Sequence, residues 1–539
     1  MESKTGLFRK GPRAMVRTAN SAAEHRTKGS LGDRVTQGAV VGLGLSLVSK
    51  LLSLAAQWIC AWYLIPEDFG QVSIVLAIYS AAQLFQSVSG IYLQLLRGKG
   101  RLLRDGIQGF YLSCLQGLVL MVVMMLAAPW IASAYGEPKL AMLLILQALT
   151  LPLDSLGLVE SVWLSRHMRF GSLNFASSVQ SFSRFGFQIL LVLCGAGVYS
   201  LVLCHPISVG LKVLALKLLS PPIPWIAPDL SRWPRLWIGA LGWMFSAFMT
   251  QFSPQVFFLI LSFGVTTDWL GIYAWGYGLA GQAAYLLSAS LASIFIPAFA
   301  SMEGDLSRQS WALRRSVRSL GMLLVPACVG LSLGAEDLIK LFFSSRWLPA
   351  APVISALALG FIYQPAMHLS MSLLHSQGRW PAAVSVYTIQ AVLGGAVAGL
   401  MLLGMPSSWL APLHAVSMAA GSLACLGVAL HRDGSAWRGA IEESLVLGVL
   451  AGILWLPVGA MRDMLSMSPL LSLVLTCFVV GLLFAALAST ALKSWATEWT
   501  SRLLRVWRAP SPEMELGAID QRSGTSDRED PKQAAGGVA

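Results

Sequence analysis

The stretch Ala39–Leu64, AVVGLGLSLVSKLLSLAAQWICAWYL, is apolar along its whole length apart from one lysine and a few small polar residues. It exceeds the roughly 20 residues that an α-helix needs to cross a bilayer. Lys50 lies at its centre, where an ionisable side chain is costly unless it faces protein or water. Ser49, Ser53 and Gln57 follow helical spacing and share the face of the lysine. We therefore predict a membrane-spanning helix with one polar face turned towards an interior.

The composition of the chain extends this prediction to the whole protein. Hydrophobic residues make up 55% and charged residues 12%, whereas soluble domains carry about 25% charged residues. The net charge of +12 does not indicate a nucleic-acid partner, because the basic residues fall between apolar segments and form no single patch. The seven cysteines are scattered singly, which predicts neither a metal site nor a disulfide framework.

About fourteen apolar segments are long enough to span a membrane, and we expect all of them to be helices. The fold class predicted is therefore an all-α polytopic membrane protein. The segments are 39–64, 70–95, 109–134, 140–164, 172–195, 198–219, 236–262, 269–300, 316–334, 350–375, 380–404, 409–430, 444–461 and 468–492.

The basic residues between these segments predict the orientation of the chain. Most of them fall in alternate connections, and only Lys139, Lys340, Arg346 and Arg462 fall in connections on the opposite side. Positively charged connections stay in the cytoplasm, so both termini are expected to be cytoplasmic. Residues 1–35 are basic and have no apolar core of a signal peptide, which predicts a cytoplasmic tail.

Short motifs recur about 200–210 residues apart, which indicates an internal repeat. Asp68–Gly70 opens the second segment and Asp268–Gly271 the eighth, while Arg169–Phe170 opens the fifth and Arg379–Trp380 the eleventh. An even number of spans per unit gives two parallel, pseudo-symmetric lobes of six helices.

The predicted parts are a tail (1–35), a first lobe (36–220), a cytoplasmic linker (221–235), a second lobe (236–431), two further helices (444–492), an amphipathic interfacial helix (493–509) and a disordered cytoplasmic tail (510–539).

The spans of the first lobe carry ionisable side chains that point to an anionic ligand. Lys50, Arg184 and Lys212 combine a point charge with the planar fork of a guanidinium, and both groups bind phosphate. We therefore predict that these three bind a phosphate or a carboxylate. The alternative is a structural pair in which Asp154 neutralises Lys50 or Arg184.

The spans of the second lobe offer aromatic and amide side chains. Aromatic faces suit the CH faces of sugar rings, and amides suit their hydroxyl groups. Such residues also fill ordinary interfaces between helices. The candidates expected to face a sugar are Gln83, from the first lobe, and Gln251, Gln255, Tyr277 and Gln282.

Several strings of residues resemble one known family. LIPEDFGQVSI (64–74), LSRHMRF (164–170), GVYSLVL (197–203), DWLGIYAWGYGLA (268–280), FIPAFASMEGD (295–305) and SSRWLPAAPVI (344–354) resemble bacterial polysaccharide transporters. These are oligosaccharide flippases of the multidrug, oligosaccharidyl-lipid and polysaccharide exporter superfamily. The resemblance covers roughly residues 32–430 and implies two six-helix lobes, a central cavity and alternating access.

The function that this resemblance implies is a flippase of the bacterial inner membrane, not an enzyme. Its substrate is a polyprenyl-diphosphate-linked oligosaccharide, moved from the inner to the outer leaflet for exopolysaccharide, O-antigen or capsule assembly. The resemblance implies that Lys50, Arg184 and Lys212 bind the diphosphate and that Asp154 and Glu160 are ion-coupling residues. H⁺ or Na⁺ is the expected coupling ion, and polysaccharide polymerase and export proteins are expected partners. No cofactor is expected, since no nucleotide-binding Gly-Lys-Ser/Thr loop occurs. The alternatives are an ion-coupled multidrug exporter of the same fold and a membrane glycan polymerase or ligase.

Overall fold

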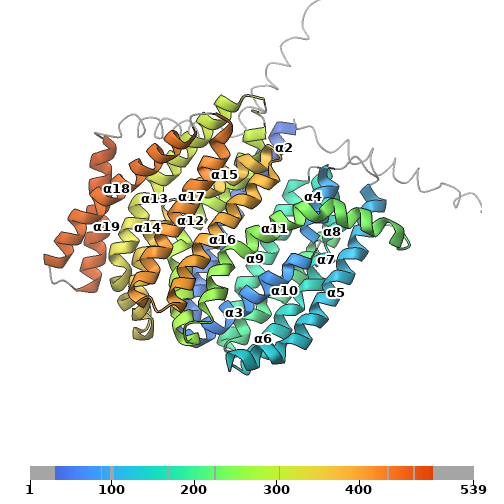
Figure 1. Cartoon of the computed structure of the whole chain (residues 1–539), viewed down its shortest axis with the longest axis horizontal. Coiled ribbons are helices and arrows are strands. Elements are labelled where there is room, and N and C mark those ends of the chain that lie inside the picture. Colours follow the sequence, from blue (N-terminus) through green and yellow to red (C-terminus); the bar gives the residue numbers. More distant parts are fainter. Residues whose placement is uncertain are drawn as a thin grey trace, which may run out of the picture. The chain divides into compact units, whose positions relative to one another are not determined.

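The computed structural model describes residues 31–86, 88–97, 102–167, 169–223, 226–300, 302, 304–433, 436–464 and 468–489. Every regular element within these ranges is a helix, which confirms the all-α prediction. Most of the helices run side by side along one common direction (Figure 1). The predicted segments 493–509 and 510–539 lie outside the described residues, as do residues 1–30 of the predicted tail. The first helix begins at Leu31, within the predicted tail of residues 1–35.

Within the described residues, the region of the predicted first lobe contains nine α-helices and one 3₁₀ turn. They are α2 (Leu31–Tyr63), α3 (Pro66–Ala82), η1 (Gln83–Phe85), α4 (Val88–Arg97), α5 (Leu102–Tyr135), α6 (Lys139–Ala148), α7 (Thr150–Ser155), α8 (Leu158–Arg166), α9 (Phe170–Leu193) and α10 (Tyr199–Leu219).

The rest of the described chain continues in the same way. It consists of η2 (Leu230–Arg232), α11 (Trp233–Leu261), α12 (Thr267–Ala300), α13 (Leu306–Phe342), η3 (Ser345–Ala350), α14 (Ala351–Phe361), α15 (Gln364–Ser376), α16 (Trp380–Leu402), η4 (Ser407–Trp409), α17 (Leu410–Leu430), η5 (His431–Asp433), α18 (Ala436–Met464) and α19 (Pro469–Ser489).

Length and composition alone give fewer membrane-spanning helices than the sequence predicted. Among the described helices, nine are long and apolar enough to cross a membrane, or eleven if each bent pair is one span. The predicted count of about fourteen is therefore not confirmed. It includes α2, α9 and α12, which have 33, 24 and 34 residues. Helix α9 carries the central cation Arg184, which lowers its hydropathy.

Two predicted straight spans are instead bent. In segment 140–164, the part Lys139–Ser155 meets α8 at 43°, and in segment 350–375, Ser345–Phe361 meets α15 at 44°. These are the fourth segments of the two predicted repeats, so the bend recurs at the corresponding place. The predicted span 70–95 is also interrupted, by η1, between α3 and α4. Broken helices at membrane depth are tolerated where they line a cavity or are covered by protein.

Local sequence explains where several helices begin. Pro66 occupies the first turn of α3, where its missing N–H costs nothing. The Asp68 side chain accepts a hydrogen bond of 3.1 Å from the backbone N–H of Ile65 and caps the same helix. The turn between α5 and α6 needs a glycine, since Gly136 has a φ of +69°. The Asp305 side chain likewise caps α13 through the N–H of Arg308.

Apolar side chains and ion pairs hold the helices together. One buried cluster joins α13, α15, α16 and α17, and another joins α4, α5, α8 and α11. Two ion pairs fasten α18 to α13: Arg318 Nε lies 2.5 Å from Glu443, and Arg462 lies 3.0 Å from the buried Asp337. Ser472 of α19 also donates to Asp337, at 2.7 Å. Arg318 and Arg462 are therefore both paired across the contact between α13 and α18.

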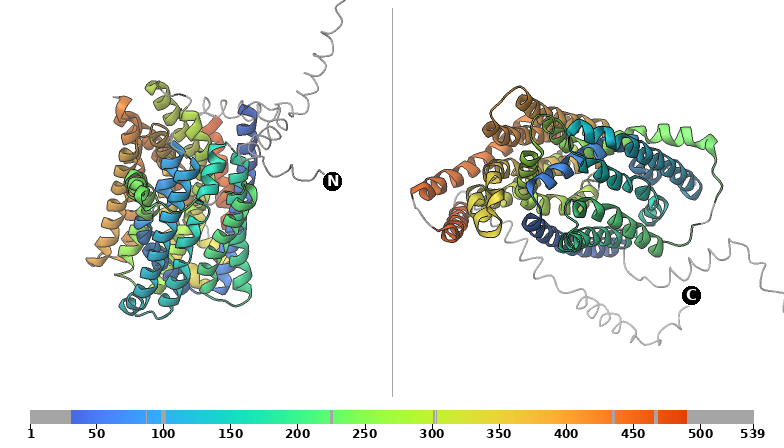
Figure 2. Two further views of the ribbon diagram at one scale, coloured as in Figure 1. Left: turned by 90° about the vertical axis from the view of Figure 1, so that its right-hand side faces the viewer. Right: turned by 90° about the horizontal axis from the view of Figure 1, so that it is seen from below.

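The predicted linker 221–235 is docked onto the beginning of α5. Gln108 Nε2 donates to the carbonyl of Ala227 at 2.8 Å, and its Oε1 accepts from the N–H of Asp229 at 2.6 Å. Arg232 lies 2.9 Å from Asp229 and 3.3 Å from Asp105. Hydrogen bonds from Ser231 and Arg232 lower the pKa of Asp229. The linker therefore fixes where α11 begins. The packed helices are seen from two further sides in Figure 2.

Candidate functional site: a polar cavity beside two bent helices

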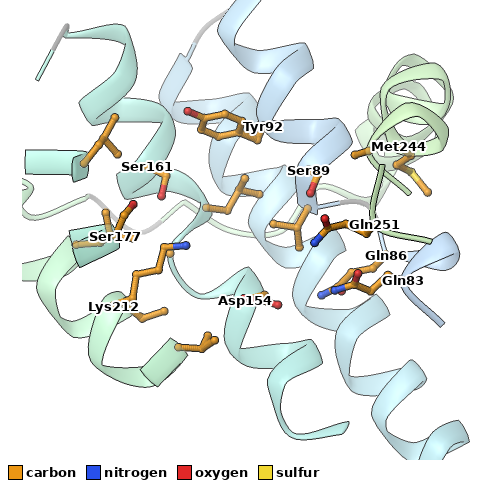
Figure 3. A pocket seen from close by; sticks show the side chains of 18 of the residues that line it. Gln83, Gln86, Ser89, Tyr92, Asp154, Ser161, Ser177, Lys212, Met244 and Gln251 are labelled. Carbon is orange, nitrogen blue, oxygen red and sulfur yellow. The ribbon is translucent and has the colours of Figure 1, made fainter. Parts of the chain in front are cut away.

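A cavity of about 610 Å³ lies among α4, α7, α8, α9, α10 and α11. Its polar lining consists of one ammonium, one carboxylate, amides and hydroxyl groups (Figure 3). These polar residues are Gln83, Gln86, Ser89, Tyr92, Asp154, Ser161, Ser177, Lys212 and Gln251. Apolar residues, among them Leu158, Met244 and Phe248, complete the wall. Mixed linings of this kind and volumes of 300–1,000 Å³ or so are typical of ligand sites.

Lys212 and Asp154 give the cavity its charge. Lys212 extends from α10 into the space between Ser161 and Asp154 (Figure 3). The Tyr79 hydroxyl lies 3.4 Å from Asp154 Oδ2, and Lys212 is the cation that acts on this carboxylate. Within the described ranges Lys212 forms no salt bridge, so its ammonium is available to an anion.

The bend between α7 and α8 shapes this part of the wall. Asp154, Gly157, Leu158 and Ser161 all face the cavity, and the bend falls among them. Gln86 supports the bent helix because its Nε2 donates to the carbonyl of Leu151 at 2.6 Å. That amide is therefore structural, although the residue lines the cavity.

The other two predicted phosphate ligands, Lys50 and Arg184, do not line this cavity. Lys50 of α2 and Arg184 of α9 interact electrostatically with each other. The Lys50 ammonium lies 6.0 Å from the centre of the Tyr285 ring, a weak cation–π contact. Arg184 Nε is buried without a hydrogen-bond partner. In the part of the chain that the structure describes, neither cation forms a salt bridge, so the pairing of either with Asp154 is not found.

The predicted sugar-facing residues separate into two groups. Gln83 and Gln251 line the cavity, whereas Gln255, Tyr277 and Gln282 do not. The Tyr277 hydroxyl lies 3.4 Å from that of Tyr285, within an aromatic cluster. Gln282 Nε2 donates to Gln57 Oε1 at 2.8 Å and so joins α12 to α2. Tyr277 and Gln282 therefore have the interface role that the sequence left open.

Glu160, the second predicted ion-coupling residue, lies apart from Asp154. It lines a separate pocket of about 270 Å³ together with Lys217, Phe110 and the linker prolines Pro221 and Pro222. Of the two candidate carboxylates, only Asp154 faces the cavity.

Sequence reasoning missed Ser89, Tyr92 and Ser161 as lining residues. Tyr92 also contacts Ser165, at 2.7 Å between the two hydroxyl oxygens. The spacing of Asp154, Gly157 and Ser161 is helical and could have indicated a shared face. Single serines are too common in membrane helices to have been selected on their own. Among the described residues no group of three His, Cys, Asp or Glu side chains could hold a metal ion.

The chain shares its fold with solved multi-pass membrane transporters. It superposes on the lipid II flippase MurJ in an inward closed conformation with a TM-score of 0.66 at 15% identity, covering 84% of this chain and 99% of that one. An inward-facing multidrug resistance MATE transporter of the MOP superfamily gives 0.52 at 14% identity, covering 76% and 99%. At these identities the likeness shows the fold.

The sequence then identifies the family. Residues 59–352 match the family described as polysaccharide biosynthesis protein, and the chain belongs to that family. The chain is 25% identical over 389 residues to the succinoglycan biosynthesis transport protein ExoT of Rhizobium meliloti, covering 70% of this chain and 78% of the relative. It is 21% identical over 281 residues to the teichuronic acid biosynthesis protein TuaB of Bacillus subtilis, covering 50% and 56%. The family resemblance drawn from the sequence motifs is thereby confirmed.

Proposed function

We propose that this protein is a flippase that moves a polyprenyl-diphosphate-linked oligosaccharide from the inner to the outer leaflet of the bacterial inner membrane. The observation that carries the proposal is the cavity in which Lys212, which has no salt bridge within the described residues, lies with Asp154, amides and hydroxyl groups. Lys212 binds a phosphate as a point charge, and Gln83, Gln251 and the serines bind sugar hydroxyls. The family and the MurJ-like fold support the same substrate class.

The position of the cavity fits loading from the cytoplasm. With both termini cytoplasmic, α9 begins and α10 ends at the inner side of the membrane. Leu173 and Ser177 lie near the beginning of α9, and Leu216 near the end of α10, and all three line the cavity. The headgroup therefore enters from the inner leaflet while the polyprenyl tail stays in the lipid. Alternating access then exposes the cavity to the outer side.

Asp154 is the proposed coupling residue for H⁺ or Na⁺. It is the carboxylate that shares the cavity with Lys212, so binding of a cation at Asp154 alters the field that the lysine offers to a phosphate. In reconstituted vesicles, we expect an imposed H⁺ or Na⁺ gradient to accelerate wild-type transport and to leave Asp154→Asn unaffected. A variant that responds like wild type removes Asp154 from the coupling.

The experiment that tests the function measures exposure of a polyprenyl-diphosphate oligosaccharide in the outer leaflet of such vesicles. Lys212→Ala should lower transport at least about tenfold, because a hydrogen bond to a charged group contributes roughly 1.5–3 kcal/mol. Lys217→Ala is the matched control, since it changes a lysine of the same helix outside the cavity. Lys50→Ala and Arg184→Ala show whether the second cation pair also handles the diphosphate.

Two other outcomes decide between the alternatives. Export of cationic dyes without movement of the lipid-linked sugar favours the multidrug exporter. Glycan chain growth or transfer by the purified protein favours a polymerase or ligase. Equal transport by wild type and Lys212→Ala removes the lysine from the mechanism.

A further inference from the structure

Helices α3 and α12 approach each other unusually closely near their N-terminal ends. Gly70 and Gly271, which belong to the two repeated motifs, meet at this crossing. A Cβ on Gly70 would lie 1.9 Å from the carbonyl oxygen of Thr267, and one on Gly271 would lie 1.7 Å from that of Pro66. Only glycine permits this backbone contact. The crossing joins the predicted first lobe to the second.

One carboxylate connects the two lobes beside this crossing. Glu137, in the turn between α5 and α6, accepts a hydrogen bond from Gln71 of α3 at 3.0 Å and one from Thr267 of α12 at 2.7 Å. Gln71 is fully buried, and the Glu137 side chain is half-buried. Of the two contacts of Glu137, the hydrogen bond from Thr267 joins the predicted first lobe to the second.

Further donors join the lobes at the same end. The indole N–H groups of Trp58 and Trp62 donate to the carbonyl of Phe342 at 2.8 and 3.0 Å. Trp347 donates to the carbonyl of Ala61 at 2.8 Å, and Arg346 to that of Leu64 at 3.2 Å. These contacts use backbone acceptors, which do not titrate. Glu137 is thus the titratable acceptor within this set of contacts.

We propose that Glu137 is a proton-binding site that controls separation of the lobes at this end. The inference rests on the proposed function, in whose orientation this end faces the outside of the cell. A hydrogen bond to an ionised acceptor is roughly twice as strong as a neutral one. Protonation therefore weakens both contacts of Glu137 and favours the arrangement that opens outward. The ionised form keeps the lobes closed, and acid on the outer side releases them.

The charged groups around Glu137 belong to the elements packed on it. Glu67 of α3 accepts from the same Gln71 at 2.9 Å and lies 3.8 Å from the Lys139 ammonium of α6. Asp68 is occupied as the cap of α3, and Asp268 is an exposed residue at the start of α12. Glu67 stays within the first lobe, so its titration breaks no contact between lobes.

The test measures the distance between the lobes directly. Spin labels at Ala134→Cys, at the end of α5, and Leu403→Cys, after α16, report on this end in nanodiscs. The background carries Cys194→Ser and Cys477→Ser, which remove the exposed native thiols. Wild type should show one short distance at neutral pH and a growing population of longer distances as the pH is lowered.

The variants separate the proton site from general loosening. Glu137→Gln should show the long population at neutral pH, shifted about tenfold in the ratio of open to closed, and lose the response to acid. Thr267→Val should open at neutral pH as well. Glu67→Gln, the matched control, should behave like wild type. Thermal unfolding of each variant establishes that it is folded.

Three results overturn the proposal: no opening of wild type in acid, a Glu137→Gln variant that keeps the wild-type response, or a Glu67→Gln variant that abolishes it. The distance measurement needs no substrate. A negative result in the flippase assay therefore does not contradict the proton site at Glu137. A negative result in the distance measurement likewise does not contradict the proposed substrate.

Discussion

At the scale of single residues, cations of the same type have different surroundings. Lys212 lines the polar cavity, whereas Lys217 on the same helix lines a different pocket. Arg318 and Arg462 form ion pairs with carboxylates. The sequence could select Lys212 because an ionisable group within a span is a functional hypothesis by default. It could not show that Lys50 and Arg184 lie outside the cavity, since that depends on the rotation of each helix against its neighbours.

The buried ion pair between Arg462 and Asp337 permits a prediction of stability. Arg462→Ala leaves the Asp337 carboxylate, whose side chain is 8% exposed, without its cation. We expect a loss of about 3–5 kcal/mol, as for other buried pairs broken at one partner. Lys340→Ala is the control on α13, the helix that carries Asp337. The ion pair of Lys340 with Glu336 is exposed and contributes about 0–1 kcal/mol to stability. Thermal unfolding in detergent measures both, and equal midpoints would contradict the prediction.

At the scale of elements, the repeat and the bends explain how the cavity is built. The two fourth segments bend by 43° and 44°, and the two second segments begin with motifs that bring Gly70 and Gly271 together. The motifs were visible in the sequence, since their spacing predicted the repeat. The bends were not visible, because each segment is continuously apolar and a straight span satisfies the same pattern.

The glycine crossing yields a prediction for its helices. Gly70→Ala forces α3 and α12 apart, because a backbone carbonyl cannot move aside as a flexible side chain does. We expect a destabilisation of about 1–3 kcal/mol or more. At Gly186 of α9 an added Cβ meets nothing within 4 Å, so Gly186→Ala should be neutral or stabilise by about 0.5–1 kcal/mol. Unfolding midpoints compare the two, and a Gly70→Ala protein as stable as wild type would refute the close contact.

At the scale of the whole molecule, the orientation in the membrane can be tested with a native cysteine. Cys194 is exposed in the connection between α9 and α10, which the distribution of Lys and Arg places outside. In spheroplasts, with Cys477→Ser, a membrane-impermeant maleimide should label Cys194 without permeabilisation. In a Cys194→Ser background, His167→Cys between α8 and α9 should be labelled only after permeabilisation. The reverse pattern would invert the proposed topology.

The sequence by itself determined the class of the protein: a helical membrane protein of this family, with an interior that carries cations. These properties follow from apolar length, charge and motif strings, which are local and additive along the chain. Tertiary structure alone decided that Lys212, Asp154, Gln83 and Gln251 share one cavity. It also decided that Glu137, in the turn between α5 and α6, accepts a hydrogen bond from Thr267 of α12. Such contacts depend on helix rotation, bending and crossing, which are set by packing between segments far apart in the sequence.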